Sequence, residues 1–191
     1  MVKLPKKLGE NERVYLSTGF RAAIDRSLRG FYYSTWAHEG QMGRYALTQF
    51  EPTSARRAYP GWDEPAYKAN FTFRMLHRVN TTALANMPSA YERSVDKEQV
   101  HQLLQTRSSG LSLHQYNLDE WLLTEFETTP KMATYLVAWA NGAFLHVSNT
   151  TISPLTGRVI PLRMYTTPDL IHQAAFSTEA MAKILPEYEK I

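Results

Sequence analysis

The chain of 191 residues contains no cysteine. This absence rules out a disulfide framework, a thiolate metal ligand and a cysteine nucleophile, and it agrees with a reducing compartment. The sequence also has no apolar run approaching the roughly 18 residues that a membrane-spanning helix needs, and its start, MVKLPKKLGENER, lacks the apolar core of a signal peptide. We therefore expect a cytoplasmic protein with no membrane partner. The Asn-x-Thr sequons that begin at Asn70, Asn80 and Asn149 are then interpreted as coincidental matches.

Neither sign of charge dominates the composition. Lys and Arg number 21 against 18 Asp and Glu, which gives a formal net charge of +3. Nucleic-acid-binding domains concentrate basic residues on one face, often beside stacking aromatic side chains, and the sequence shows no such clustering. We therefore expect no nucleic-acid partner. The remaining alternative, binding through the mildly basic start of the chain, predicts an affinity that falls steeply with salt.

The chain does contain enough apolar surface for a globular core, with 43% hydrophobic and 12% aromatic residues. Short β-prone runs bounded by turn residues predict strands at 14–20, 30–36, 44–50, 70–77, 82–87, 115–126, 133–147 and 158–165. Residues 133–147 are apolar on both faces, which is typical of a strand in the middle of a packed sheet, and Asn141-Gly142 is interpreted as a bulge or bend within it. The polar residues 89–112 are predicted to form an exposed connection, with one helical turn at 97–105.

The pattern changes after Tyr165. Apolar residues then recur at helical spacing, at Ile171, Ala174, Ala175, Met181, Ile184, Leu185 and Tyr188. Asp169 follows a proline and is a candidate N-cap, and Pro186 is expected to kink or end the helix or to open a second turn. One long helix after a run of strands predicts a domain boundary, with residues 1–165 in an incomplete β domain and residues 166–191 forming the first helix of another domain.

Local catalytic motifs are absent. A zinc-hydrolase helix carries two histidines four residues apart, with a glutamate next to the first. His38-Glu39 begins such a pattern, but Met42 stands where the second histidine belongs, and no pair of the six histidines has this spacing. The sequence also has no G-x-S-x-G nucleophile elbow, no phosphate-binding P-loop and no dinucleotide fingerprint. We therefore expect no catalytic residue, no metal site and no cofactor in this chain.

The most unusual stretch is TQFEPTSARRAYPGWDEPAYKANF, residues 48–71. Its prolines and its glycine predict tight turns between two strands. Thr53 or Ser54 can cap a helical turn over residues 55–59, and Asp63 can cap a second short turn. The chain is therefore expected to fold back sharply after the strand that enters this stretch.

Two polar residues lie at the end of that strand. Pro52 restricts Glu51 to an extended conformation. The sharp turn that follows is therefore expected to hold Gln49 and Glu51 at the end of a rigid strand. A carboxylate in such a position can pair with a cation. The alternative interpretation is that Glu51 is an ordinary solvated surface acid.

The same stretch is part of a wider resemblance. Further blocks are RGFYYS at 29–34, ALANMP at 83–88, FETTPKMATYLVAW at 126–139 and RMYTTPDLIHQAAFSTEAMAKILPEYEKI at 163–191. In order and approximate spacing, over essentially the whole chain, these blocks resemble the amino-terminal domain of zinc aminopeptidases of the aminopeptidase N and puromycin-sensitive type. Gly61 stands where many members of that family have a cysteine, a departure that is compatible with the turn.

The resemblance implies a fold and a site. It implies a mainly β fold, a partial β-sandwich or saddle domain followed by one C-terminal α-helix that begins a thermolysin-like catalytic domain. The residues that match Gln49 and Glu51 point into the active site in that family and recognise the α-amine of the peptide substrate. The chemistry is suitable, because an amino terminus is an ammonium with three donors, and a carboxylate beside an amide oxygen satisfies it with charge-assisted hydrogen bonds.

The resemblance also implies missing parts. The Gly-Ala-Met-Glu-Asn substrate motif and the H-E-x-x-H zinc helix of the family do not occur in this sequence. Zinc is therefore implied for a full-length relative and not for this chain, which we interpret as a fragment, a truncated relative or an incomplete gene model, inactive without its partner, the missing catalytic domain. We expect unpaired sheet edges and exposed apolar surface. The alternative is a non-catalytic β-fold module that binds a protein partner.

Overall fold

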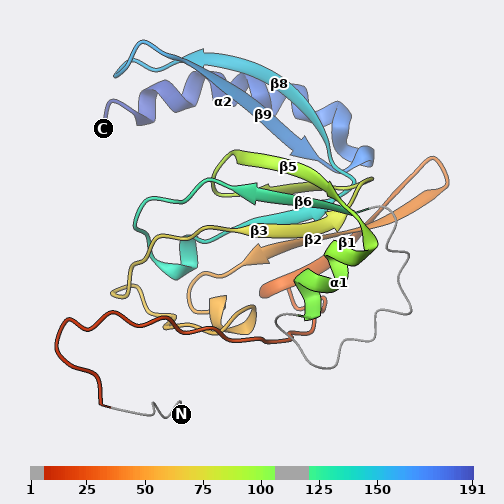
Figure 1. Cartoon of the computed structure of the whole chain (residues 1–191). Helices are drawn as coiled ribbons and strands as arrows, with labels where there is room; N and C mark the ends of the chain where they lie inside the picture. The colour runs from red at the N-terminus through yellow and green to blue at the C-terminus, as the bar shows by residue number, and fades with distance from the viewer. Residues whose placement is uncertain (1–6, 106–120) are drawn as a thin grey trace.

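The computed structural model describes residues 7–105 and 121–191 (Figure 1). The strands are β1 (Gly30–His38), β2 (Gln41–Gln49), β3 (Arg74–Arg78), β4 (Thr82–Ala85), β5 (Ser89–Val95), β6 (Trp121–Phe126), β7 (Trp139–Gly142), β8 (Leu145–Ile152) and β9 (Val159–Thr166). The α-helices are α1 (Lys97–Gln105) and α2 (Ala174–Tyr188), and short 3-10 helices are η1 (Ala55–Arg57), η2 (Thr134–Leu136) and η3 (Pro168–Gln173).

In the described part of the chain the strands form three antiparallel sheets. The first has the order β1-β2-β7-β4, the second has the order β3-β6-β5, and β8 and β9 form a two-stranded hairpin. Figure 1 shows α2 lying along this hairpin at one side of the molecule, with the other two sheets beneath it. The mainly β fold with a C-terminal helix that the sequence predicts is confirmed.

Several strands lie where the sequence places them. The predicted strands at 30–36, 44–50, 82–87 and 158–165 correspond to β1, β2, β4 and β9. The period of two that runs into β3 is also present, because Phe71 and Phe73 are half-buried whereas Thr72 and Arg74, which alternate with them, are exposed. Residues 121–126 of the predicted strand at 115–126 form β6, and its first part lies outside the described residues.

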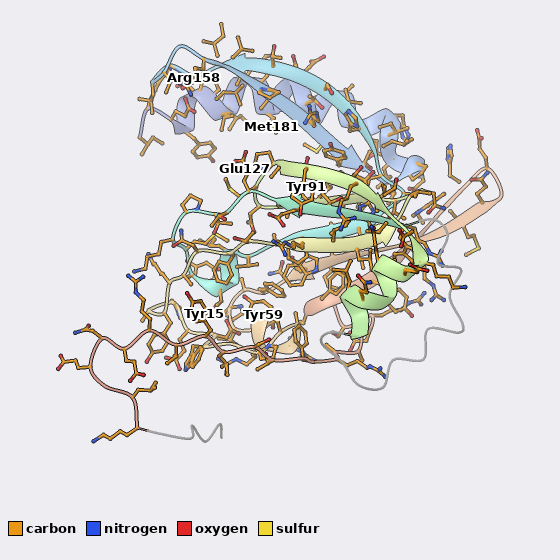
Figure 2. All side chains as sticks on the ribbon, in the orientation of Figure 1. Tyr15, Tyr59, Tyr91, Glu127, Arg158 and Met181 are labelled. Atoms are coloured by element: carbon orange, nitrogen blue, oxygen red, sulfur yellow. The ribbon has the colours of Figure 1, made fainter. Side chains whose placement is uncertain are left out.

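The predicted strand at 14–20 is wrong for this structure. Residues 13–24 form no strand and run as an exposed arm along the lower edge of the body in Figure 1. Val14 is 52% exposed, and Tyr15, which is labelled in Figure 2, is 101% exposed. A strand needs a neighbouring strand for its backbone hydrogen bonds, so β-prone residues without one stay outside the sheets.

The predicted strand at 133–147 is instead divided among three elements. Residues 134–136 form η2, β7 ends at Gly142, and β8 then begins a different sheet at Leu145. A tight turn separates the strands, since the Phe144 N–H donates to the Gly142 carbonyl at 2.8 Å. The Asn141-Gly142 pair therefore ends a strand and does not bulge within one. The central position was correctly predicted, because β7 lies between β2 and β4.

Gly142 ends β7 against Tyr45 of β2. A Cβ added at position 142 would lie 2.5 Å from the Tyr45 Cβ and 3.2 Å from the Tyr45 Cα, so one strand would have to shift. We expect Gly142→Ala to lower the free energy of unfolding by about 1–3 kcal/mol, measured by urea titration. Gly61→Ala is the control, because a Cβ there would meet the Tyr59 ring at an ordinary 3.5 Å. Equal losses in both variants would contradict the close packing of β2 on β7.

The polar stretch 89–112 contains more structure than predicted. Its first residues form β5, an edge strand of which only Val95 is buried, so the sequence carries no apolar alternation that would reveal it. The helical turn predicted at 97–105 is confirmed as α1. Val100 of this helix is 0% exposed and packs with Val95 and with Leu123 of β6. Residues 106–112 lie outside the described part.

The C-terminal helix packs on the β8–β9 hairpin. The Thr151 hydroxyl of β8 donates to the Ala182 carbonyl at 2.8 Å, and the Ser153 hydroxyl donates to the Glu189 carboxylate at 2.6 Å. Asp169 is not the N-cap that the sequence suggests, because the helical region opens with η3, which Thr167 precedes. Pro186 lies within the last turn of α2. In the described part of the chain, no helix is both long and apolar enough to cross a membrane.

Candidate functional site at the end of strand β2

The two predicted site residues lie on either side of a buried phenylalanine. Gln49 is the last residue of β2 and pairs with Gly30 of β1. Phe50, the next residue, is only 2% exposed, whereas Gln49 and Glu51 are both exposed. The strand ends at Gln49, and Glu51 lies in the turn that follows it. The structure therefore exposes both polar residues on either side of one buried side chain.

An aromatic cluster fixes this strand end. The Phe50 ring contacts the rings of Tyr59 and Trp139 edge-on, with centroid distances of 5.9 Å and 5.1 Å. Trp139 in turn stacks on Phe73 at 4.8 Å and lies 5.5 Å from the Phe31 ring. Aromatic pairs of this kind add about 0.5–1.5 kcal/mol each beyond the area they bury. Phe50 therefore anchors the backbone that carries Gln49 and Glu51.

The chain turns back directly after the site, as the sequence predicts. The Glu51-Pro52 peptide is cis, and the Ser54 N–H donates to the Phe50 carbonyl at 2.6 Å. The short helix η1 follows at Ala55–Arg57, within the helical turn expected at residues 55–59. Its cap differs from the expectation, because Ser54 makes no side-chain hydrogen bond to this turn.

Asp63 provides that cap from across the loop. Its carboxylate accepts hydrogen bonds from the Arg56 backbone N–H at 3.0 Å and from the Arg56 Nε at 3.2 Å. The Thr134 hydroxyl donates to the other oxygen at 2.6 Å, and Asp63 is only 5% exposed. The sequence suggests that Asp63 caps a second turn, and this expectation is wrong because its carboxylate caps η1 instead. It ties η1 to Thr134, which lies 71 positions after Asp63 in the chain.

The surroundings of this loop shift two pKa values. Burial alone would raise the pKa of Asp63, but the hydrogen bonds from Thr134 and from the backbone and side chain of Arg56 outweigh it, and the pKa lies below its ordinary value. Burial, with a smaller contribution from the negative charge of Asp63, raises the pKa of Tyr59 to about 12. The Tyr59 hydroxyl is buried without a hydrogen-bond partner among the described residues. Stability linked to Tyr59 is therefore lost only as pH rises above 10.

The lowered pKa of Asp63 predicts acid sensitivity. Since the folded state holds this carboxylate ionised, its contribution is present above pH 3.8 and is lost as pH falls through the lowered pKa. We expect Asp63→Asn to lower the free energy of unfolding by about 1–3 kcal/mol at pH 7. Below about pH 4 the free energy of unfolding of this variant is expected to fall less with pH than that of the unmodified chain. Urea titrations between pH 7 and pH 2.5 measure both. The control is Glu64→Gln, an exposed neighbour; identical pH profiles for Asp63→Asn and the unmodified chain would contradict this role.

The Glu51 carboxylate is free to bind a ligand. Among the described residues it takes part in no ion pair or side-chain hydrogen bond. The Gln49 amide reaches the Glu51 backbone carbonyl only through a long Nε2 to oxygen distance of 3.5 Å, which leaves its own oxygen available. Two acceptors, one of them charged, are therefore exposed on a rigid strand end. Such a pair suits a cation with several donors, such as an ammonium.

The described residues offer no metal site. No group of three or more His, Asp or Glu side chains among them could hold an ion. His38 and Glu39, which begin an incomplete zinc motif in the sequence, lie at the β1–β2 turn and not on a helix. The side chains described therefore do not fit zinc ligation.

Comparison with known proteins agrees with the fold and with the sequence blocks. Residues 1–136 match the Peptidase M1 N-terminal domain family. The chain is 34% identical to human endoplasmic reticulum aminopeptidase 2 over 188 residues, which are 98% of this chain and 17% of that protein. It is 31% identical to the thyrotropin-releasing hormone-degrading ectoenzyme of Rattus norvegicus over 196 residues, and 30% identical to the glutamyl aminopeptidase of Bitis rhinoceros over 175 residues.

The chain therefore belongs to the Peptidase M1 N-terminal domain family. The predicted resemblance to the amino-terminal domain of aminopeptidases is confirmed. The matches to the ectoenzyme and to the glutamyl aminopeptidase cover 100% and 92% of this chain and 16% of each relative. The chain thus spans about a sixth of the length of these relatives.

Proposed function

We propose that this chain supplies recognition of the substrate's α-amine to a zinc-dependent aminopeptidase, which removes amino-terminal residues from peptides. Glu51 and Gln49 bind the ammonium group of the peptide. The observation that carries the proposal is the pair of exposed acceptors on either side of the buried Phe50, with the Glu51 carboxylate unengaged within the described part. Membership of the M1 amino-terminal family supports it.

The recognition works by charge and by position. The Glu51 carboxylate accepts charge-assisted hydrogen bonds from the ammonium, and the Gln49 amide oxygen accepts one from a remaining donor. Since the aromatic cluster holds the strand end, the two acceptors fix where the peptide begins. The bond cleaved is then the one after the first residue, because the amine cannot advance further.

Peptide hydrolysis itself is assigned to a partner, the catalytic domain. The zinc ion implied by the family resemblance would bind there, because the side chains described here do not form a metal site. We assign residues 166–191 to the first helix of that domain, and the packing of α2 on β8 and β9 supplies the junction. By itself the chain is expected to have no hydrolytic activity.

A pair of measurements tests this function. The purified chain is expected to bind no stoichiometric zinc and to release no p-nitroaniline from aminoacyl p-nitroanilides. A chimaera, in which the chain replaces the matching residues of human endoplasmic reticulum aminopeptidase 2, is expected to hydrolyse these substrates. Chelator-sensitive turnover by the chain alone would overturn the assignment of hydrolysis to the partner. A folded chimaera without activity would contradict the proposed contribution.

The alternative is a non-catalytic module that binds a protein partner. Exposed apolar side chains on α2 favour it, since Phe176 is 79% exposed, Tyr188 is 69% exposed and Ile184 is 50% exposed. Substitution of Glu51 by alanine separates the two functions. Chimaera activity that requires Glu51 supports recognition of the amine, whereas activity that is indifferent to Glu51 leaves only a packing role for this chain.

A further inference from the structure

A network of polar side chains joins the two larger sheets. Its members are Asn141 of β7, Thr81 just before β4, His77 of β3, Thr124 of β6 and Glu92 of β5. His77 is 3% exposed and Thr124 is 1% exposed, so the centre of the network is closed to solvent. Since a buried polar group without a partner is costly, the place of each proton in this network affects the stability of the fold.

The Nδ1 atom of His77 must carry a proton. It lies 3.1 Å from the Arg78 carbonyl oxygen, which can only accept a hydrogen bond. It also lies 3.1 Å from the Thr81 hydroxyl oxygen, whose own proton is donated to the same carbonyl at 2.8 Å. The Asn141 amide donates to this hydroxyl oxygen at 2.9 Å. Both partners of Nδ1 are therefore acceptors.

The other ring nitrogen, Nε2, also faces acceptors. It lies 2.9 Å from the Thr124 hydroxyl oxygen. That hydroxyl donates its only proton to the Glu92 carboxylate at 2.6 Å, and the carboxylate oxygen itself lies 3.6 Å from Nε2. All of these contacts are satisfied together only when Nε2 carries a proton as well. A neutral His77 beside an ionised Glu92 therefore leaves the network one proton short.

The Glu92 carboxylate balances the charge of this additional proton. In the described part of the chain, the hydrogen bonds and ion pairs of the network include one charged side chain besides His77, that of Glu92. The neighbouring charged residues of these strands lie on the opposite face of the sheet, in the pairs Arg78–Trp121, Arg74–Glu125 and Arg93–Gln99. Because histidine is ordinarily a stronger base than glutamate, the proton resides on the ring.

We propose that His77 is a pH-sensitive switch in the joint between the two sheets. With the imidazolium, every hydrogen bond of the network is formed. When the Nε2 proton leaves to solvent, the Thr124 hydroxyl turns its own proton from Glu92 to Nε2. The Glu92 carboxylate then loses the hydrogen bond that ties this part of the edge strand β5 to β6.

The number of protons sets the direction of the pH dependence. In an unfolded chain histidine is protonated below about pH 6.5, and glutamate is ionised above about pH 4.3. Between these values the folded and unfolded chains carry the same proton, and the network contributes fully. At higher pH the unfolded chain releases the proton freely, whereas the folded chain must keep it or give up a hydrogen bond. The free energy of unfolding is therefore expected to fall as pH rises above about 6.5.

Nuclear magnetic resonance of the ring nitrogens tests the protonation directly. In the purified chain with ¹⁵N-labelled histidine, both ring nitrogens of His77 are expected to carry protons at about pH 5.5, and Nδ1 alone at about pH 8.5. His77→Gln identifies the signals by their loss, and His146→Gln, at an exposed ring of β8, is expected to retain them. A ring without an Nε2 proton at about pH 5.5, or with a proton on Nε2 alone at about pH 8.5, overturns the proposal.

Glu92→Gln separates the switch from a purely structural role. The amide that replaces the carboxylate can donate to the Thr124 hydroxyl, which is then able to donate to a neutral His77. The network is thus satisfied without the additional proton. Between about pH 5.5 and about pH 8.5 the urea midpoint of the unmodified chain is expected to fall by roughly 0.5 M, and that of the variant by less than half as much.

Glu127→Gln is the matched control for this substitution. Glu127 is an exposed acid directly after β6, and its replacement changes the net charge by the same amount. Its urea midpoint is expected to fall with pH as in the unmodified chain. Equal falls in the unmodified chain and in Glu92→Gln overturn the proposal, because the pH dependence then comes from other groups.

Discussion

Replacing Glu51 by glutamine in the aminopeptidase chimaera is expected to lower kcat/KM for aminoacyl p-nitroanilides by about 10–100-fold. The carboxylate makes charge-assisted hydrogen bonds to the substrate ammonium, worth about 1.5–3 kcal/mol, and the amide that replaces it keeps the shape but loses the charge. Gln49→Ala is expected to cost less, about 3–10-fold, because it removes one neutral acceptor. Initial rates at low substrate concentration measure both ratios.

The control for this prediction is Glu64→Gln in the same chimaera. Glu64 is an exposed acid in the loop that follows the site, and its loss changes the net charge by the same amount. We expect its kcat/KM to stay within about twofold of the unmodified chimaera, since exposed charges are screened. A loss in Glu64→Gln as large as that in Glu51→Gln would show that general charge, and not the position of Glu51, controls the rate.

The second large effect is expected at Phe50. Phe50→Ala removes a ring that is 2% exposed and contacts Tyr59 and Trp139, and we expect it to lower the free energy of unfolding of the chain by about 3–5 kcal/mol. Phe50→Leu keeps most of the volume and is expected to cost less than half as much. Urea titrations at pH 7, monitored by circular dichroism, give these values.

Phe176→Ala provides the matched comparison for Phe50→Ala. The same ring is removed there from a side chain that is 79% exposed on α2, so the expected change is within about 0.5 kcal/mol. If the two phenylalanine substitutions cost the same, the aromatic cluster does not anchor the strand end. In that case the positions of Gln49 and Glu51 would need another structural cause.

The sequence predicts those parts of the fold that depend on local patterns. The β1–β2 hairpin, the alternation that leads into β3 and the C-terminal helix all follow from residues close together in the chain. The arm at residues 14–20 shows the limit of such patterns. Its β-propensity is real, but strand formation depends on a neighbouring strand, which no local pattern can supply. Residues 133–147 show a second limit, since an apolar run does not reveal that its two halves belong to different sheets.

The candidate site was partly predictable for the same reason. Strand alternation and the Glu51-Pro52 pair predict an exposed position for Gln49 and Glu51, and both residues are exposed in the structure. The role of Asp63 was not predictable, because its partner Thr134 lies 71 positions away in the sequence. Its carboxylate follows a glycine and a tryptophan in a turn, where a local cap is the simplest expectation.

The most direct test of the account is a comparison of substrates with and without an α-amine. The chimaera and its Glu51→Gln variant are assayed with leucine p-nitroanilide and with 4-methylpentanoyl p-nitroanilide, which differ only in the amino group. We predict that the unmodified chimaera has the higher kcat/KM for the amine-bearing substrate. The ratio of the two kcat/KM values is expected to be at least tenfold smaller in the variant, which corresponds to a coupling free energy of about 1.4 kcal/mol. An unchanged preference in the variant would contradict the binding of the α-amine by Glu51.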